Sequence, residues 1–161
     1  MLGEILLIED SPADIALFLY ALKARALPYR LTALTRASEV EAFVRHAAIA
    51  APPSPRLIIT DYYMPGMETA DVMAAIRTVP AYQRIPVLLF SSLAEEEGQR
   101  RLAHCGAVAF VHKPGDLEEF VTAVATMVHR WGATGVGSDS APARDERQVK
   151  DSDGPETKPD S

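Results

Sequence analysis

Four short apolar runs, each followed by polar residues, constrain the fold of this chain more than any other feature. The runs cover residues 5–8, 57–59, 87–90 and 108–111, and the polar residues after them include Glu9, Asp10, Asp61, Ser91 and Lys113. Continuous aliphatic runs of this length are typical of parallel strands that are buried on both faces. Because the carboxyl ends of parallel strands meet at one edge of a sheet, the polar side chains are expected to gather there.

The segments between the apolar runs carry helical patterns, and together they predict the fold class. Ser11, Pro12 and Asp14 form a helix start, with serine at the N-cap and proline at the first helical position. Ser38 is expected to cap the next helix, and residues 29–35 are expected to add a further strand. Five strands alternating with five helices predict an α/β protein with a doubly wound five-stranded parallel sheet flanked by five helices.

Size, charge and cysteine content exclude several classes of protein. A chain of 161 residues suits one domain, and its net charge of −6 gives no electrostatic footprint for nucleic acid. No apolar run approaches the roughly 18 residues that a membrane span needs. Cys105 is the single cysteine, so neither an internal disulfide nor a structural zinc site is expected. The N-terminus lacks the basic flank of a signal peptide, and a cytoplasmic location is expected.

The composition changes near residue 132 and predicts a domain boundary there. Residues 132–161 consist mainly of Gly, Ser, Asp, Pro, Lys and Arg, with only scattered Ala and Val as apolar residues. Such a segment buries too little apolar surface to offset the entropy of ordering it. We therefore expect a folded domain over residues 1–131 and a disordered polar tail over residues 132–161, with no output domain after the core.

The residues at the predicted sheet edge favour phosphoryl chemistry with a divalent cation. Three carboxylates at one edge repel one another unless a cation lies among them, and oxygen ligands suit Mg²⁺. Asp61 is a candidate nucleophile, since a carboxylate that attacks a phosphoryl group forms a mixed anhydride. Mg²⁺, the Lys113 ammonium and the Ser91 hydroxyl would each hold part of the charge on the phosphoryl oxygens.

This set of motifs resembles the receiver domains of two-component response regulators. The resemblance extends over residues 3–131 and rests on the Glu9-Asp10 pair, Asp61 with Met-Pro-Gly at 64–66, Ser91 and Lys113-Pro114. Residues 8–14 also resemble stand-alone, single-domain receivers, including those that partner phytochrome-type histidine kinases. The resemblance implies the flavodoxin-like receiver fold.

The resemblance also implies a phosphorylation site and its metal ligands. Asp61 would be the phosphoacceptor and would bind Mg²⁺ directly together with Asp10. Glu9 would bind the ion through water, and the backbone carbonyl of Tyr63 would be a further ligand.

The remaining roles implied by the resemblance concern the response to phosphorylation. Lys113 would pair with the phosphoryl oxygens, and its peptide bond to Pro114 is cis in the family. Ser91 would move toward the phosphoryl group, and Phe110 matches the aromatic switch residue that turns inward when this hydroxyl moves.

Four positions depart from the family pattern or vary within it. Thr69 follows Glu68 where the family often has glycine, and a β-branched residue disfavours positive φ, so the loop after Asp61 is expected to differ locally. Gly115 replaces a large apolar residue, which is expected to reshape the face built from the last two helices. Tyr63 and Leu93 fill the two variable positions that flank the phosphoryl group, and we hypothesise that their bulk makes the aspartyl phosphate long-lived.

These observations favour a signalling module over an enzyme that turns over a metabolite. The expected partners are a sensor histidine kinase or a phosphotransfer protein, with phosphorylation-dependent homodimerisation across the last strands and helices as one form of output. A Mg²⁺-dependent phosphatase of the haloacid-dehalogenase type is an alternative, but it requires a second acid where this chain has Tyr63, and a cap domain. A receiver-fold scaffold that is never phosphorylated is the other alternative, which Thr69 and Gly115 keep open.

Overall fold

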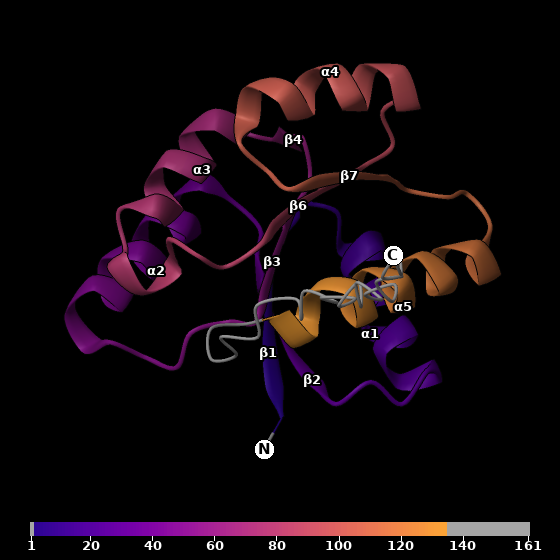
Figure 1. Ribbon diagram of the computed structural model, residues 1–161, viewed down its shortest axis with the longest axis horizontal. Coiled ribbons are helices and arrows are strands. Elements are labelled where there is room, and N and C mark those ends of the chain that lie inside the picture. The colour runs from indigo at the N-terminus through magenta and orange to yellow at the C-terminus, as the bar shows by residue number, and fades with distance from the viewer. Residues whose placement is uncertain (1, 135–161) are drawn as a thin grey trace, which may run out of the picture.

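The sheet has five parallel strands, as the sequence predicts. The structure is a computed structural model that describes residues 2–134. The strands are β1 (Gly3–Ile8), β2 (Tyr29–Leu34), β3 (Leu57–Thr60), β6 (Val87–Ser91) and β7 (Ala109–His112). They are ordered β2-β1-β3-β6-β7 (Figure 1), which is the flavodoxin-like order. The predicted doubly wound fold is confirmed.

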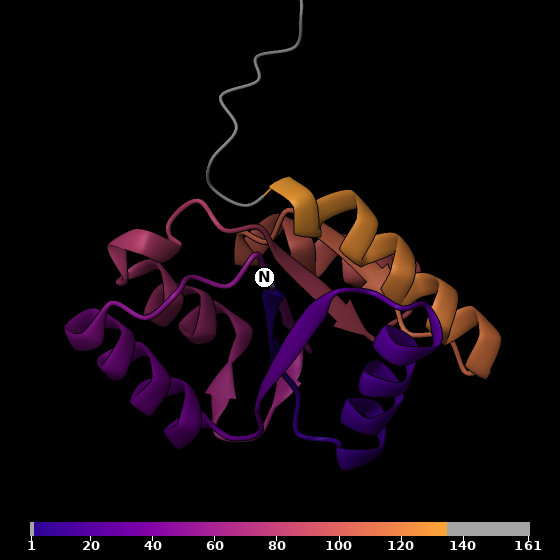
Figure 2. The same cartoon turned by 90° about the horizontal axis from the view of Figure 1, so that it is seen from below.

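Helices cover both faces of the sheet. Helices α1 (Pro12–Ala24) and α5 (Leu117–Trp131) lie together on one face, and α2 (Ala37–Ala50) and α3 (Thr69–Arg77) lie on the other (Figure 2). Helix α4 (Glu95–Cys105) packs beside α3 and against β7. None of the helices within residues 2–134 is both long and apolar enough to span a bilayer.

The continuous apolar runs arise because each central strand is buried on both faces. In β1, Ile5 and Leu7 pack in the core beneath α1 and α5, while Leu6 and Ile8 pack in the core beneath α2 and α3. Side chains alternate between the faces of a strand, so a strand covered on both sides is apolar at every position. The polar residues then begin only where the strand leaves the two cores.

The predicted start of α1 is confirmed by a side-chain hydrogen bond, and α5 begins in the same way. The Ser11 hydroxyl accepts from the backbone N–H of Asp14 at 3.3 Å at the start of α1. The Asp116 carboxylate accepts from the backbone N–H of Glu119 at 3.0 Å at the start of α5. Each bond satisfies a donor that the first turn of a helix leaves unpaired.

The predicted cap of α2 is wrong. The helix begins at Ala37, with Arg36 at the N-cap and Ser38 already within the first turn. The Glu39 carboxylate instead reaches back to Thr35, accepting from its backbone N–H at 2.6 Å and from its hydroxyl at 3.1 Å. A carboxylate in the first turn thus holds the chain entering the helix.

Thr69 fits its position without backbone strain. It is the first residue of α3, only 3% exposed, and its hydroxyl donates to the carbonyl of Tyr62 at 2.9 Å. Among the described non-glycine residues, positive φ occurs only at Ala26 and Ala51. The turn before Thr69, between β4 (Tyr63–Met64) and β5 (Met67–Glu68), contains Gly66 at φ 80°.

The chain continues briefly beyond α5. Residues Gly132–Thr134 form a 3₁₀ turn, η2, that packs on the end of α5. Residues 135–161 lie outside the described part of the chain, so the boundary at residue 132 and the disordered tail remain predictions.

The C-terminus of α1 supplies a test of backbone strain. Ala26 has φ 49°, and its N–H donates to the Lys23 carbonyl while the Leu27 N–H donates to the Leu22 carbonyl. This Schellman arrangement normally places glycine at the left-handed residue. Ala26→Gly is expected to raise the free energy of unfolding by about 0.5–1 kcal/mol, because relief of strain exceeds the added entropy of the unfolded chain.

Urea denaturation monitored by circular dichroism measures this change. Ala16→Gly, on the exposed side of the same helix, is the matched control, and it is expected to lower the free energy of unfolding by about 1 kcal/mol. A loss of stability in both variants would contradict the assigned strain at Ala26.

Candidate functional site

An open pocket lies at the carboxyl edge of the sheet, where the loops after β1, β3, β6 and β7 meet. Its volume is about 640 Å³. Its lining includes Glu9, Asp10, Asp14, Asp61, Tyr63, Ser92, Lys113 and Phe120. Side chains as far apart in sequence as Glu9 and Lys113 therefore share one pocket, as the parallel topology predicts.

Three carboxylates in this pocket are close enough to share a cation. One oxygen each from Glu9, Asp10 and Asp61 lies within 4.8 Å of the other two. Neighbouring ligands of an octahedral Mg²⁺ at about 2.1 Å from the ion are separated by about 3 Å. The all-oxygen donor set and its spacing therefore fit Mg²⁺.

The Lys113 ammonium lies against this acidic group. Its Nζ donates to Glu9 Oε2 at 2.5 Å, to Asp14 Oδ2 at 2.8 Å and to Asp61 Oδ2 at 2.9 Å. The Lys113 side chain is only 8% exposed. The positive charge of Lys113 is thus largely shielded from solvent, and three charge-assisted hydrogen bonds stabilise the charged form.

Burial and pairing shift the pKa values of Glu9 and Lys113. Burial raises the pKa of the Glu9 carboxyl to about 7, although hydrogen bonds from Lys113 and from the backbone of Ser11 act in the opposite direction. Burial alone would lower the pKa of Lys113, but its hydrogen bonds to the three carboxylates outweigh burial, and the pKa is raised. Lys113 thus stays charged throughout the physiological range, whereas Glu9 gains or loses its proton near neutrality.

The backbone holds Asp61 at the end of β3. Its N–H donates to the carbonyl of Ile8, the last residue of the neighbouring β1, at 3.0 Å. One carboxylate oxygen accepts from Lys113 and the other from the backbone N–H of Tyr63, at 3.4 Å. The Asp61 side chain remains 13% exposed, so the carboxylate opens into the pocket.

The structure separates the predicted hydroxyl from the pocket. Ser91 is fully buried and its Oγ accepts from the backbone N–H of Leu93 at 3.5 Å, while Ser92 lies on the pocket wall. Leu93 is half-buried and its carbonyl accepts a hydrogen bond from His112 Nδ1 at 2.7 Å. Ser91 therefore has to move to reach a group on Asp61.

Phe110 also lies away from the pocket, beneath α4. Its side chain is 7% exposed, and its ring lies so close to Gly98 that a Cβ at that position would overlap it. In this structure the aromatic ring is thus already directed inward.

The expected cis peptide bond after Lys113 is wrong. Every peptide bond within residues 2–134 is trans, including the Lys113-Pro114 bond that the family resemblance implied to be cis. Trans is also the intrinsically preferred isomer before proline. Gly115 is exposed and borders open space, since a Cβ there would meet no atom within 4 Å, and the position imposes no requirement for glycine.

Sequence reasoning missed the place of Asp14 in the site. It was interpreted only as an acid in the first turn of α1. The spacing in the sequence is the signal that could have shown this role. Asp14 lies four residues after Asp10 and three after the Ser11 cap, so it belongs to the first turn of α1, which lines the pocket. Its carboxylate is therefore a fourth acid in the site.

Solved structures with the same fold include two response regulators, one of which is linked by name to a phytochrome. The phosphorylated cyanobacterial phytochrome response regulator RcpA is 26% identical with a TM-score of 0.69, and the match covers 81% of this chain and 94% of RcpA. The Mn²⁺-bound response regulator Rcp1 is 26% identical with a TM-score of 0.68, covering 82% of this chain and 96% of Rcp1.

Curated relatives share part of their length with this chain. The phosphate regulon transcriptional regulatory protein PhoB from Rhizobium meliloti is 27% identical over 130 residues, covering 81% of this chain and 54% of PhoB. Response regulator Rcp1 from Synechocystis sp. is 32% identical over 94 residues, covering 58% of this chain and 64% of Rcp1. The chain thus spans about half the length of PhoB.

The family model of the response regulator receiver domain matches residues 5–125, which include most of β1, the four other strands of the sheet and the first part of α5. The matched range contains the carboxylate cluster, the buried Ser91 and Lys113, all of which lie at the same edge of the sheet. The chain belongs to the family of response regulator receiver domains.

Proposed function

We propose that this receiver domain is a phosphorylation switch that accepts a phosphoryl group on Asp61 from a sensor histidine kinase or a phosphotransfer protein. The observation that carries the proposal is the position of Lys113, whose ammonium lies 2.9 Å from Asp61 Oδ2 beside an acidic cluster that fits Mg²⁺. The arrangement supplies a nucleophile and a fixed cation at the same place. The complete set of acids and the buried lysine disfavour the alternative of a scaffold that is never phosphorylated.

In the proposed transfer, a carboxylate oxygen of Asp61 forms a bond to phosphorus while the bond from phosphorus to the histidine nitrogen breaks. The electron pair of that bond remains on the imidazole nitrogen, and Asp61 becomes a mixed anhydride. Lys113 neutralises charge on the phosphoryl oxygens and orients the Asp61 carboxylate. Asp10, Asp61, Glu9 and the Tyr63 carbonyl would hold Mg²⁺, which screens the repulsion between the carboxylates and the phosphoryl group when it is bound.

The proposed partner is a phytochrome-type histidine kinase. Support comes from RcpA and from the bacteriophytochrome response regulator RtBRR, which is 26% identical with a TM-score of 0.61 over 78% of this chain and 77% of RtBRR. The name of each relates it to a phytochrome, and RcpA was solved in its phosphorylated form.

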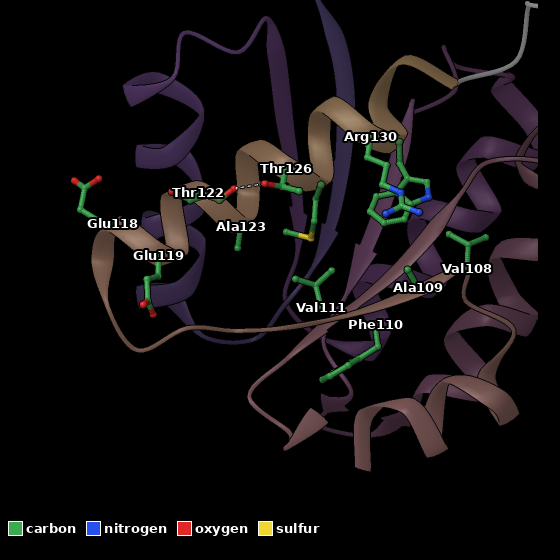
Figure 3. A pocket seen from close by; sticks show the side chains of 12 residues that line it. Val108, Ala109, Phe110, Val111, Glu118, Glu119, Thr122, Ala123, Thr126 and Arg130 are labelled. Atoms are coloured by element: carbon green, nitrogen blue, oxygen red, sulfur yellow. Dashed lines mark hydrogen bonds between the residues drawn. The ribbon is translucent and has the colours of Figure 1, made fainter. Parts of the chain in front are cut away.

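A contact surface for output is proposed at the edge strand β7. An apolar pocket of about 660 Å³ lies there between β7 and α5, with Ala109 and Val111 of the strand facing Ala123 of the helix (Figure 3). Met127 of α5 also lines this pocket. Within residues 2–134, strand β7 pairs only with β6, and residues of β7 line this pocket. An exposed apolar edge of this kind suits a second copy of the chain, which supports the proposed phosphorylation-dependent homodimer.

Asp61→Asn tests the acceptor directly. After incubation with Mg²⁺ and acetyl phosphate, the wild-type protein is expected to gain the mass of one phosphoryl group, measured by intact mass spectrometry. The variant is expected to gain none, because an amide is not a competent nucleophile. Equal labelling of both proteins would place the acceptor at another residue.

The raised pKa of Glu9 predicts a pH dependence of metal binding. Between pH 4.5 and about 7 the folded protein holds a proton on Glu9 that the unfolded chain has lost, so stability of the metal-free protein falls as the pH rises through this window. Mg²⁺ has to displace that proton. Its affinity, measured by isothermal titration calorimetry, is expected to rise about tenfold from pH 6 to pH 8.

Glu9→Gln is the matched control for this pH dependence. The glutamine has no proton to lose, so the affinity of the variant for Mg²⁺ is expected to be lower and nearly constant over the same range. A pH dependence that persists in Glu9→Gln would assign the titration to another group.

The exposed Tyr63 ring predicts a slow loss of the phosphoryl group. Tyr63 is 61% exposed and lines the pocket, whereas Leu93 is half-buried and does not. Tyr63→Asn is therefore expected to shorten the lifetime of the aspartyl phosphate several-fold by admitting water, and Leu93→Ala to shorten it less. The decay of radiolabel after removal of the phosphodonor measures these lifetimes. Equal lifetimes in the wild type and in the Tyr63→Asn, Leu93→Ala double variant would refute the hypothesis that the two side chains shield the phosphoryl group from water.

A further inference from the structure

We propose that Asp14 is a positioning residue that occupies, in the unphosphorylated protein, the hydrogen-bonding place on Lys113 that an incoming phosphoryl oxygen takes. The proposal rests on the proposed phosphorylation of Asp61. Asp14 lies in the first turn of α1. When the phosphoryl group arrives, the Asp14 carboxylate exchanges its hydrogen bond from Lys113 for hydrogen bonds from water.

The number of donors on Lys113 gives the first argument. An ammonium group has three N–H donors and no acceptor. Glu9, Asp14 and Asp61 each lie within hydrogen-bonding distance of Nζ, so the three donors are all engaged before phosphorylation. A phosphoryl oxygen that binds Lys113 therefore has to displace one of these carboxylates.

The surroundings of the three carboxylates show which one is displaced. Glu9 is 2% exposed, and its second carboxylate oxygen accepts from the backbone N–H of Ser11 at 3.0 Å, so it is held at both ends. Asp61 carries the phosphoryl group and stays beside Lys113. Asp14 is 31% exposed, and within residues 2–134 Lys113 is the hydrogen-bond partner of its carboxylate. Release of Asp14 costs the least, because water is available to replace its bond.

Charge gives a second argument for the same residue. Glu9, Asp14 and Asp61 bind Lys113, Asp10 lines the same pocket, and a phosphoryl group would add further negative charge. An acid that stays bound to Lys113 both blocks a donor and repels the phosphoryl oxygens. Asp14 thus opposes phosphorylation until it moves away.

The helix start does not depend on the Asp14 carboxylate. The bond to the Ser11 hydroxyl is made by the backbone N–H of Asp14, which any substitution other than proline retains. The carboxylate adds a favourable interaction with the helix N-terminus of about 0.3–1 kcal/mol. Substitutions at this position therefore test the carboxylate while the fold is preserved.

Phosphorylation rates of the full chain test the proposal. Wild type, Asp14→Ala, Asp14→Asn and Asp14→Glu are incubated with acetyl phosphate at a Mg²⁺ concentration that saturates each protein, and labelling is followed by intact mass spectrometry. Asp14→Ala is expected to be labelled about three- to tenfold faster, since a donor of Lys113 is already free. Asp14→Asn is expected to be intermediate, because its amide oxygen accepts from Lys113 more weakly, and Asp14→Glu is expected to restore a rate close to wild type.

A second readout separates this role from a general effect on structure. Beryllofluoride, an acyl phosphate mimic, is expected to bind Asp14→Ala more tightly than wild type by a similar factor. Glu41→Gln, which removes one exposed charge from α2 on the other face of the sheet, is the matched control and is expected to leave both rate and affinity unchanged. A purely structural role would lower the rate and the affinity together.

The outcomes distinguish this proposal from the proposed function. If wild type is not labelled, or if Asp61→Asn is labelled equally, phosphorylation of Asp61 is refuted. If wild type is labelled on Asp61 while Asp14→Ala and Asp14→Asn are labelled at the wild-type rate or more slowly, the role of Asp14 is refuted and the switch itself remains.

Discussion

The ion-pair cluster around Lys113 is the interaction on which the site depends. The lysine extends from the end of β7 into a group of acids that follow β1 and β3 and begin α1. Without the ammonium, these carboxylates would repel one another at a partly buried position. The pairing therefore holds the loops of one sheet edge together, and the hydrogen bond from Lys113 opposes the rise in the pKa of Glu9 that burial causes.

A cluster of this kind favours a switch because its charges are not balanced. Four carboxylates line the pocket that holds Lys113, and three of them bind its ammonium. A bound Mg²⁺ would add positive charge to this group, and the proposed phosphoryl group would add negative charge. In the proposed switch, each change would alter which hydrogen bonds Lys113 makes. The backbone N–H of Lys113 also donates to the carbonyl of the buried Ser91 at 2.8 Å, so the lysine lies directly beside the residue that ends β6.

The strands and the gathering of the acids were predictable from the sequence, whereas side-chain orientations were not. Burial on both faces requires continuous apolar runs, so the ends of β1, β3 and β7 are visible in the sequence. Whether Ser91 points into the pocket depends on the orientation of the last residue of β6. In the structure this residue is buried and does not line the pocket. Asp14 was missed because an acid in the first turn of a helix has an ordinary explanation, and only the tertiary fold shows that this turn faces Lys113.

The tight contact between Gly98 and the ring of Phe110 has a consequence for how α4 and β7 vary together. Glycine within a helix costs about 1 kcal/mol relative to alanine, so α4 gives up intrinsic stability to leave room for a large ring. A bulkier residue at 98 is compatible only with a smaller side chain at 110 or with a ring turned to solvent. Positions 98 and 110 are therefore constrained as a pair, because the inward rotamer of Phe110 requires a residue without a side chain at position 98.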